Sequence, residues 1–161
     1  MGAMSAHWLL PAAIVVATVV AMEGAAVGVH RFVMHGFGWR WHRSHHEHRT
    51  GLFEMNDLYA VVFAGISILL FLVGSEVPAL WWVGLGMVVY GVLYSLLHDA
   101  LVHRRLPFPG SPRSGYMKRL VQAHRLHHAI RDRDGAVSFG FLYAPPVATL
   151  VKQLRSRRPA G

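Results

Sequence analysis

Three long apolar runs alternate with polar stretches along the chain. They cover about residues 8–29, 57–73 and 79–97, and the first contains a single charged residue, Glu23. A membrane-spanning helix needs roughly 20 apolar residues, with a lower limit near 17. The first and third runs reach this length, and the second reaches it with its polar start included. The pattern therefore predicts three membrane-spanning helices.

A fourth apolar stretch at residues 139–151 is short and contains Pro145 and Pro146. We expect it to lie at the membrane interface or to re-enter the membrane, with a fourth span as the alternative. The polar segments 30–56 and 98–161 carry most of the His residues. The predicted fold is an all-α integral membrane protein, a single domain over residues 1–161, with three to four transmembrane helices and a His-rich helical cap.

The composition supports a membrane protein. Among 161 residues, 53% are hydrophobic and 15% charged, and the mean hydropathy is +0.34. Soluble chains are about one quarter charged. The first apolar run is preceded by no Lys or Arg, so we expect a retained span rather than a cleaved signal peptide.

The basic residues are distributed on one side of the predicted spans. The 16 Lys and Arg outnumber 8 Asp and Glu, and all of them lie in residues 31–49 or 104–158. With three spans these segments share one side, which the positive-inside rule assigns to the cytoplasm. This topology explains the pI of about 10.8 without a nucleic-acid partner. We expect a multi-pass membrane protein.

Twelve His and no Cys point to the chemistry. The absence of Cys excludes disulfides, Cys-ligated zinc, a self-contained iron–sulfur cluster and a thiol nucleophile. The His residues form a pattern that occurs twice, a pair spaced i, i+5 followed by a triple spaced i, i+3, i+4. The first copy is His30, His35, His42, His45 and His46, and the second is His98, His103, His124, His127 and His128.

The spacing predicts metal ligands. On an α-helix, positions i, i+3 and i+4 share one face, so each triple is expected to aim three imidazoles at one point. Members of an i, i+5 pair diverge by about 140° on a regular helix. Either the helix is distorted there, for which Gly28 and Gly36 offer room, or the two His face different metals. We favour the second option, with two metals that each draw ligands from both halves.

Two His fall outside the pattern. His7 begins the first span on the opposite membrane side, and His48 is expected to be a solvated neighbour of the site. Because His30 and His98 each end an apolar span, the metals are expected just below the hydrocarbon layer. This position suits a lipid substrate that enters between the first and third spans.

Several polar residues are candidates for supporting roles. Glu23 lies two helical turns before His30 and either orients a ligand imidazole or extends to the membrane edge. Tyr90 and Tyr94 lie on the face of His98 and either line a pocket or pack between spans.

Three further candidates lie beside the motifs. Asn56 and Asp57 are either partners of the ligands or, for Asn56, the N-cap of the second span, which is the favoured interpretation. Asp99 adjoins His98 and is a candidate hydrogen-bond partner of another ligand.

The His pattern resembles the fatty-acid hydroxylase/sterol desaturase superfamily of membrane non-haem di-iron oxygenases. Within it, the longer strings are similar to those of bacterial β-carotene 3-hydroxylases. The resemblance extends from about Met22 to Pro146, through HRFVMHG at 30–36, WHRSHHE at 41–47, NDLYAVVF at 56–63, HDALVH at 98–103, AHRLHHA at 123–129 and VSFGFLYAPP at 137–146.

The resemblance implies O₂-dependent hydroxylation of β-ionone rings at carbon 3, which converts β-carotene through β-cryptoxanthin to zeaxanthin. It also implies two iron ions, a ferredoxin-type electron donor and a location in a bacterial inner membrane. The chain has no Cys and no convincing nucleotide fingerprint, so electrons must come from outside it. The alternatives are a fatty-acid, sterol or carotenoid-ketone enzyme of the same superfamily, or a His-rich membrane metal-binding or transport protein.

Overall fold

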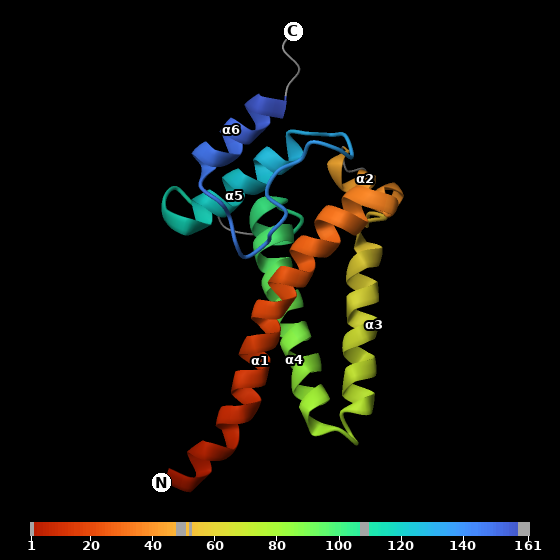
Figure 1. Cartoon of the computed structure of the whole chain (residues 1–161), viewed down its shortest axis with the longest axis vertical. Helices are drawn as coiled ribbons and strands as arrows, with labels where there is room; N and C mark the ends of the chain where they lie inside the picture. Colours follow the sequence, from red (N-terminus) through yellow and green to blue (C-terminus); the bar gives the residue numbers. More distant parts are fainter. Residues whose placement is uncertain (1, 48–50, 52, 107–109, 158–161) are drawn as a thin grey trace.

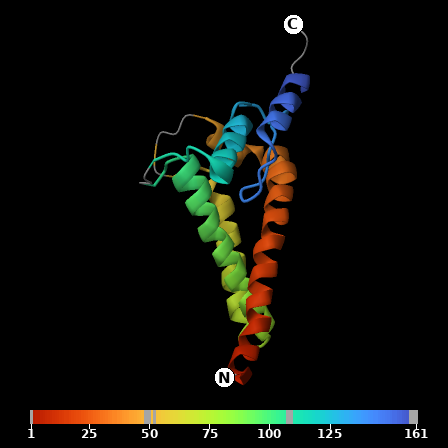
Figure 2. The same cartoon turned by 90° about the vertical axis from the view of Figure 1, so that its left-hand side faces the viewer.

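The computed structural model describes residues 2–47, 51, 53–106 and 110–157, and every regular element there is helical. Figure 1 shows a long stem of helices with a cap at the end where the C-terminus lies, and Figure 2 shows the same division from the side. The elements in order are α1 (Gly2–Gly28), η1 (Val29–Phe37), α2 (Trp39–His46), α3 (Asp57–Val73), α4 (Pro78–Tyr94), η2 (Ser95–Val102), α5 (Gly115–His128) and α6 (Val147–Arg157).

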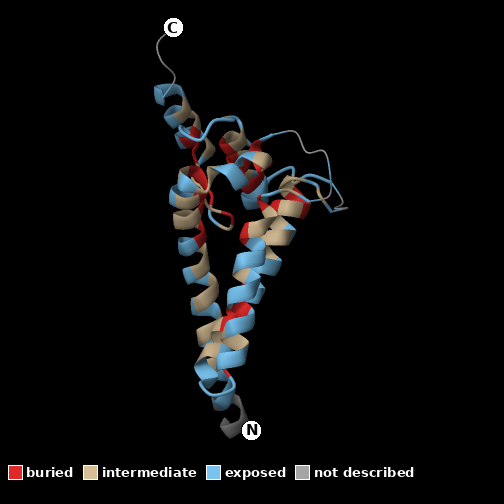
Figure 3. Cartoon of the chain, turned by 90° about the vertical axis from the view of Figure 1, so that its right-hand side faces the viewer, coloured by how far each residue is buried: buried red, intermediate tan, exposed pale blue. Residues whose placement is uncertain are grey.

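Two helices of the described chain are long and apolar enough to cross a membrane. They are His7–Phe37 and Pro78–Val102, while the apolar helix α3 is shorter, at 17 residues. Both helices are longer than the predicted spans 8–29 and 79–97 because η1 and η2 continue them, η1 with a kink at Gly36. Exposed side chains cover the stem in Figure 3, and many are large and apolar, among them Val16, Val20, Leu69 and Val92. Such a surface is stable against lipid rather than water, so the chain is membrane-associated.

Helix α4 packs against both α1 and α3. Two glycines on opposite faces allow this close approach. A Cβ on Gly84 would lie 3.2 Å from the Ser67 carbonyl oxygen of α3, and one on Gly86 would lie 2.5 Å from Thr18 Cβ of α1. By contrast, α1 and α3 make little direct contact with each other. They are widest apart at the end away from the cap, as Figure 1 shows.

The segments η1 and η2 are π-helical, with backbone bonds between residues five apart. The Gly38 N–H donates to the Val33 carbonyl at 2.8 Å, and the His103 N–H donates to the His98 carbonyl at 2.9 Å. In this geometry residues i and i+5 lie on the same face. The i, i+5 pairs of His therefore point the same way.

The cap contains α2, α5, α6 and the segment 129–146, hereafter the closing segment. Its small apolar core consists of Leu120, Ala123, Val137, Ala144 and Leu150. Residues 139–146 form no helix, and α6, with 11 residues, packs against α5. The alternative of a fourth span over 139–151 is therefore wrong, because no helix of sufficient length forms there.

Candidate metal centre

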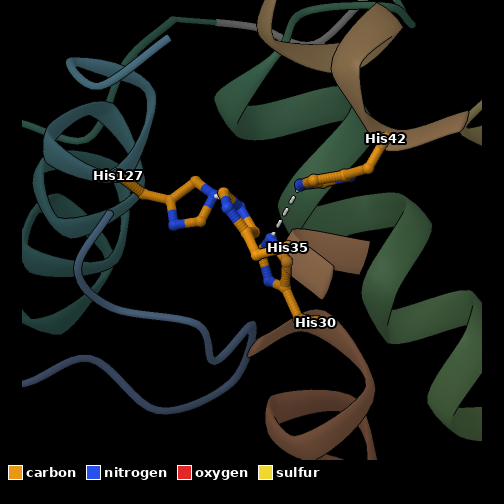
Figure 4. A group of neighbouring side chains, drawn as sticks. All are labelled: His30, His35, His42 and His127. Carbon is orange, nitrogen blue, oxygen red and sulfur yellow. Dashed lines mark hydrogen bonds between the residues drawn. The ribbon is translucent and has the colours of Figure 1, made fainter. Parts of the chain in front are cut away.

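Ten His side chains meet where the stem joins the cap, in two adjoining clusters. Cluster 1 contains His30, His35, His42 and His127, and Figure 4 shows their rings converging from three elements, η1, α2 and α5. Cluster 2 contains His45, His98, His103 and His124. The remaining two, His46 and His128, stack with ring centroids 4.4 Å apart between the clusters. By their Nε2 contacts, His46 is counted with cluster 1 and His128 with cluster 2.

Within cluster 1 the Nε2 atoms face one another. His30 Nε2 lies 3.1 Å from His42 Nε2, and His35 Nε2 lies 3.2 Å from His127 Nε2. The Nε2 atom of His46 lies 3.2 Å from the same atom of both His42 and His127. The Nε2 atoms of four imidazoles therefore converge within 4.8 Å of one another, and that of His46 adjoins the group.

Cluster 2 repeats this arrangement. His45 Nε2 lies 3.0 Å from His98 Nε2, and His103 Nε2 lies 2.9 Å from His124 Nε2. His128 Nε2 lies 2.8 Å from His124 Nε2. The two clusters are thus matched sets of five nitrogens.

The ligand-spacing predictions need two corrections. The expectation that His30 and His35 face different metals is wrong, because the π-helix places both in cluster 1, and η2 does the same for His98 and His103 in cluster 2. The triples, expected to aim at one point, are instead divided between the clusters. Each cluster does draw imidazoles from both halves of the chain, as predicted.

In cluster 1 the Nδ1 atoms, hereafter the inner nitrogens, mostly face backbone carbonyls. The closing segment supplies four of these acceptors over only ten residues. The pairs are His46 Nδ1 with Ile130 O at 2.9 Å, His35 Nδ1 with Arg133 O at 2.6 Å, His127 Nδ1 with Val137 O at 3.0 Å, and His30 Nδ1 with Phe139 O at 3.0 Å. The fifth ring, His42, has the Asn56 amide oxygen 2.7 Å from its Nδ1.

In cluster 2 the acceptors are carboxylates. His45 Nδ1 donates to Glu54 Oε2 at 2.9 Å, and His98 Nδ1 donates to Asp99 Oδ1 at 2.9 Å. A carboxylate behind an imidazole fixes the tautomer and increases the basicity of the ring. The two clusters therefore differ in the charge that surrounds them.

These contacts determine what the clusters accommodate. A carbonyl or carboxylate oxygen only accepts, so each paired Nδ1 atom donates its proton and leaves a lone pair on Nε2. Burial lowers the pKa of His42 to about 3 and that of His46 to about 4, so both rings are neutral at pH 7. Facing lone pairs cannot hydrogen-bond to each other. A shared cation satisfies them, and all-imidazole sets suit iron, zinc, copper or nickel.

The supporting residues behave differently from some expectations. The N-cap interpretation of Asn56 is wrong, because its side chain makes no capping bond and instead contacts His42. Asp99 pairs with its neighbour His98 and not with another ring of the set. Asp57 binds the Arg105 guanidinium with both oxygens, at 2.7 and 2.6 Å.

Glu23 contradicts both of its predicted roles. Its Oε1 atom accepts three backbone N–H bonds from residues 141–143, and its Oε2 atom accepts the Tyr90 hydroxyl proton at 2.8 Å. The carboxylate thus neither orients an imidazole directly nor extends to the membrane edge. It binds the closing segment.

An apolar cavity of about 460 Å³ lies beneath the clusters, between α1, α3 and α4. Its walls include Met22 and Ala26 from α1 and Ala60 and Phe63 from α3. Tyr90 and Tyr94 also line it, and the same two residues pack against Ala26 and Phe141 between the spans, so both expected roles describe them.

Two aromatic residues at the upper end of the cavity pack on the imidazoles. Tyr94 stacks on His98 with centroids 4.5 Å apart. Phe141 stacks on His30 at 5.2 Å and meets His98 edge-on at 5.2 Å. These two aromatic rings separate the cavity from the two clusters.

The two His outside the pattern are easily placed. His7 is exposed in α1, 23 residues before His30, which is about 35 Å along a helix. It therefore lies far from both clusters, as predicted. His48 lies outside the described residues.

Sequence reasoning missed Glu54 and the carbonyls of the closing segment. Glu54 was detectable as one of only eight acidic residues, nine positions after His45. A backbone carbonyl has no signature in the side-chain pattern, so Ile130, Arg133, Val137 and Phe139 could not be identified by residue type.

Comparison with known proteins agrees with this geometry. Residues 15–145 match the fatty acid hydroxylase family. The chain belongs to that family. Residue 15 lies in α1 and residue 145 in the closing segment, so the match includes the second half of α1, all of α3 and α4, and every imidazole of the two clusters.

Individual relatives are more specific. The chain is 56% identical over 156 residues to a beta-carotene hydroxylase of Pantoea ananas, covering 95% of this chain and 88% of the relative. It is 58% identical over 144 residues to a beta-carotene hydroxylase of Paracoccus sp. (strain PC1), covering 88% and 89%. A chloroplastic beta-carotene 3-hydroxylase 1 of Arabidopsis thaliana is 38% identical over 138 residues, 83% of this chain and 44% of that protein. No solved structure matches the chain.

Proposed function

We propose that this protein is a membrane monooxygenase that hydroxylates the β-ionone rings of β-carotene at carbon 3, giving β-cryptoxanthin and then zeaxanthin. The observation that carries the proposal is the apolar cavity whose inner wall, Tyr94 and Phe141, packs on two convergent imidazole clusters. The names of the relatives supply the substrate class and the ring position. Each hydroxylation consumes one O₂, two electrons and two protons and yields one water.

The cavity walls suit a hydrocarbon substrate. Its volume falls within the range of about 300–1,000 Å³ that small-molecule sites occupy. Met22, Ala26 and Phe63 offer only apolar contacts to a ring. At the inner end, Tyr94 and Phe141 hold the ring edge next to the imidazoles and keep water away from it.

The two clusters would hold two iron ions, one in each set of five imidazoles. Ligated iron supplies the dioxygen activation and the oxidising power that breaks an unactivated ring C–H bond. The protein's own part is orientation. Asn56, Glu54 and Asp99 hold the inner nitrogens of His42, His45 and His98, so each Nε2 atom keeps its lone pair directed inward.

Substrate reaches the cavity sideways from the bilayer, between α1 and α3. This differs from the expected route between the first and third apolar runs, because α1 and α4 pack closely together. Ala60 and Ala64 of α3 line the cavity and remain exposed, so they border the opening. A lipophilic chain can therefore extend into the membrane while its ring lies at the clusters.

The proposed topology has three spans: α1 with η1, α3, and α4 with η2. All sixteen Lys and Arg lie in residues 31–49 or 104–158, and those that the structure describes lie at the cap end. The positive-inside rule therefore favours a cytoplasmic cap. A cytoplasmic electron donor of the ferredoxin type fits this basic face, because acidic donors are steered to it electrostatically.

Pigment analysis tests the function. Bacterial cells that accumulate β-carotene and express this chain should form zeaxanthin with some β-cryptoxanthin, whereas cells expressing the His98→Ala variant should not. Unchanged β-carotene, with the wild-type protein verified in the membrane, would overturn the proposal. A reporter fused after Gly161 that is active only outside the cytoplasm would overturn the topology.

A further inference from the structure

The closing segment connects the metal centre to the membrane stem. Four of its carbonyls hold inner nitrogens of cluster 1, as described above for His46, His35, His127 and His30. No helix or sheet hydrogen-bonding fixes the backbone of residues 137–146. The positions of these carbonyls must therefore depend on what the segment binds at its other contacts.

Glu23 provides the contact nearest the membrane. Its Oε1 atom lies 3.0 Å from the backbone nitrogens of Phe141 and Leu142 and 2.9 Å from that of Tyr143. Its Oε2 atom accepts the Tyr90 hydroxyl proton at 2.8 Å. One carboxylate thus receives four hydrogen bonds from two elements remote in sequence, and bonds to an ionised acceptor are the stronger kind.

The loop is shaped for this carboxylate. At Gly140 an added Cβ would lie 2.7 Å from Glu23 Oε1 and 2.7 Å from the Tyr143 carbonyl oxygen. Only glycine therefore permits the three successive N–H groups to approach the carboxylate. The close fit indicates a built contact between the loop and α1.

The consequences of the contact reach both the metal centre and the cavity. Phe139, two residues before the bound N–H groups, supplies the carbonyl behind His30. Phe141 lies against His30 and His98 and lines the inner end of the cavity. A displaced loop would release an imidazole of cluster 1 and open this wall.

We propose that Glu23 is a positioning residue for cluster 1. It fixes the closing segment to α1, so that the segment's carbonyls orient the imidazoles and Phe141 closes the cavity toward the clusters. Cluster 2 depends on it less, because Phe141 only packs on His98, whereas the inner nitrogens of His45 and His98 are held by Glu54 and Asp99. The inference rests on the proposed metal centre.

Metal titration of the purified, metal-stripped protein in detergent tests this inference, with Co²⁺ as the probe and its absorption bands as the readout. The wild type should bind two ions. The Glu23→Ala variant should bind one of them about 10–100-fold more weakly, the effect typical of losing support behind a ligand, and the other unchanged. Glu54→Ala should weaken the other ion instead.

Two further variants separate positioning from folding or charge. Gly140→Ala leaves α1 intact and should reproduce the selective loss. Glu23→Gln should bind both ions within about threefold of the wild type, because its amide oxygen still accepts the three N–H bonds and its NH₂ group can donate to Tyr90. Glu76→Ala, at the far end of the stem, is the matched acidic control and should behave as the wild type.

The outcomes are distinct. Equal binding of both ions by Glu23→Ala and wild type, or a Glu23→Gln variant as impaired as Glu23→Ala, would overturn the positioning role. Equal weakening of both ions in Gly140→Ala would also overturn it, because the effect would not be specific to cluster 1. A wild type that binds no metal would instead refute the metal centre itself.

Discussion

The Nε2 atoms of His45 and His98 lie 3.0 Å apart although each ring donates its other nitrogen's proton to a carboxylate, His45 to Glu54 and His98 to Asp99. Two neutral imidazoles in this arrangement present lone pairs to each other. The contact is unfavourable unless a cation lies between them. Facing Nε2 atoms recur across the ten rings of the two clusters and underlie the predictions that follow.

Alanine substitution of any of the ten cluster His residues should reduce β-carotene conversion by about 10–100-fold or more, with the protein still inserted. Each substitution removes one imidazole and opens a coordination position. His7→Ala should retain activity because that residue is far from the clusters. The measurement is pigment conversion relative to membrane protein level, and normal activity in alanine variants of either His triple would contradict the shared centre.

The stem and the set of His residues could be predicted from the sequence because each depends on a pattern of residue types. Apolar runs of span length identified α1 and α4, and the repeated spacing identified every His of the clusters. Their grouping was not predictable from a period of 3.6 residues. The π-helical turns of η1 and η2 alter that period and bring His30 beside His35.

The partners of the imidazoles were harder to predict. Asn56 had two roles compatible with its position, and only the three-dimensional contact with His42 decides between them. The sequence marks Glu23 as unusual, but its hydrogen-bond donors are backbone N–H groups 118 to 120 residues away. Nothing in the local sequence indicates a contact between residues so far apart along the chain.

Removing the metal should lower thermal stability. Chelator-treated protein in detergent should unfold at a lower temperature, because ligand binding at 100 times its Kd stabilises a fold by about 2.7 kcal/mol. Fe²⁺ added without oxygen should restore the melting temperature, whereas Mg²⁺ should not, since imidazole sites prefer transition metals. Identical unfolding curves with and without Fe²⁺ would argue against a structural metal centre.

Glu54 is expected to support His45. Glu54→Ala should reduce activity by about 10–100-fold, because the ring loses the acceptor that fixes its tautomer. Glu54→Gln should lose less, since its amide oxygen still accepts the proton. Glu47→Ala is the matched control, because Glu47 is an exposed residue paired with Arg43. Turnover per bound iron checks the prediction, and equal activity of Glu54→Ala and wild type would refute it.

The opening between α1 and α3 predicts a steric effect. Ala60→Phe should block it and reduce β-carotene turnover by about tenfold or more, with metal content unchanged. Val61→Phe is the control, because Val61 is 64% exposed and is not part of the cavity wall. Comparable turnover in both variants would indicate that substrate follows another route.

The packing of α4 on α1 predicts a loss of stability. Gly86→Val should destabilise the stem by about 1–3 kcal/mol, because its side chain would overlap Thr18. Gly91→Ala is the control, since a Cβ there meets no atom within 4 Å. Unfolding in detergent and denaturant measures the difference. Equal midpoints for the two variants would disprove the close approach.

The closing segment lies far along the chain from His30 and Glu23, its hydrogen-bond partners. This separation determines the order in which parts of the protein fold. Phe139 lies 109 residues after His30, and Phe141 lies 118 residues after Glu23. During synthesis, α1 and α3 emerge well before either partner exists, and contacts so distant in sequence are the last to form. The nascent chain therefore completes cluster 1 only when nearly all of it has left the ribosome, so premature termination before Phe139 leaves membrane helices without a finished centre.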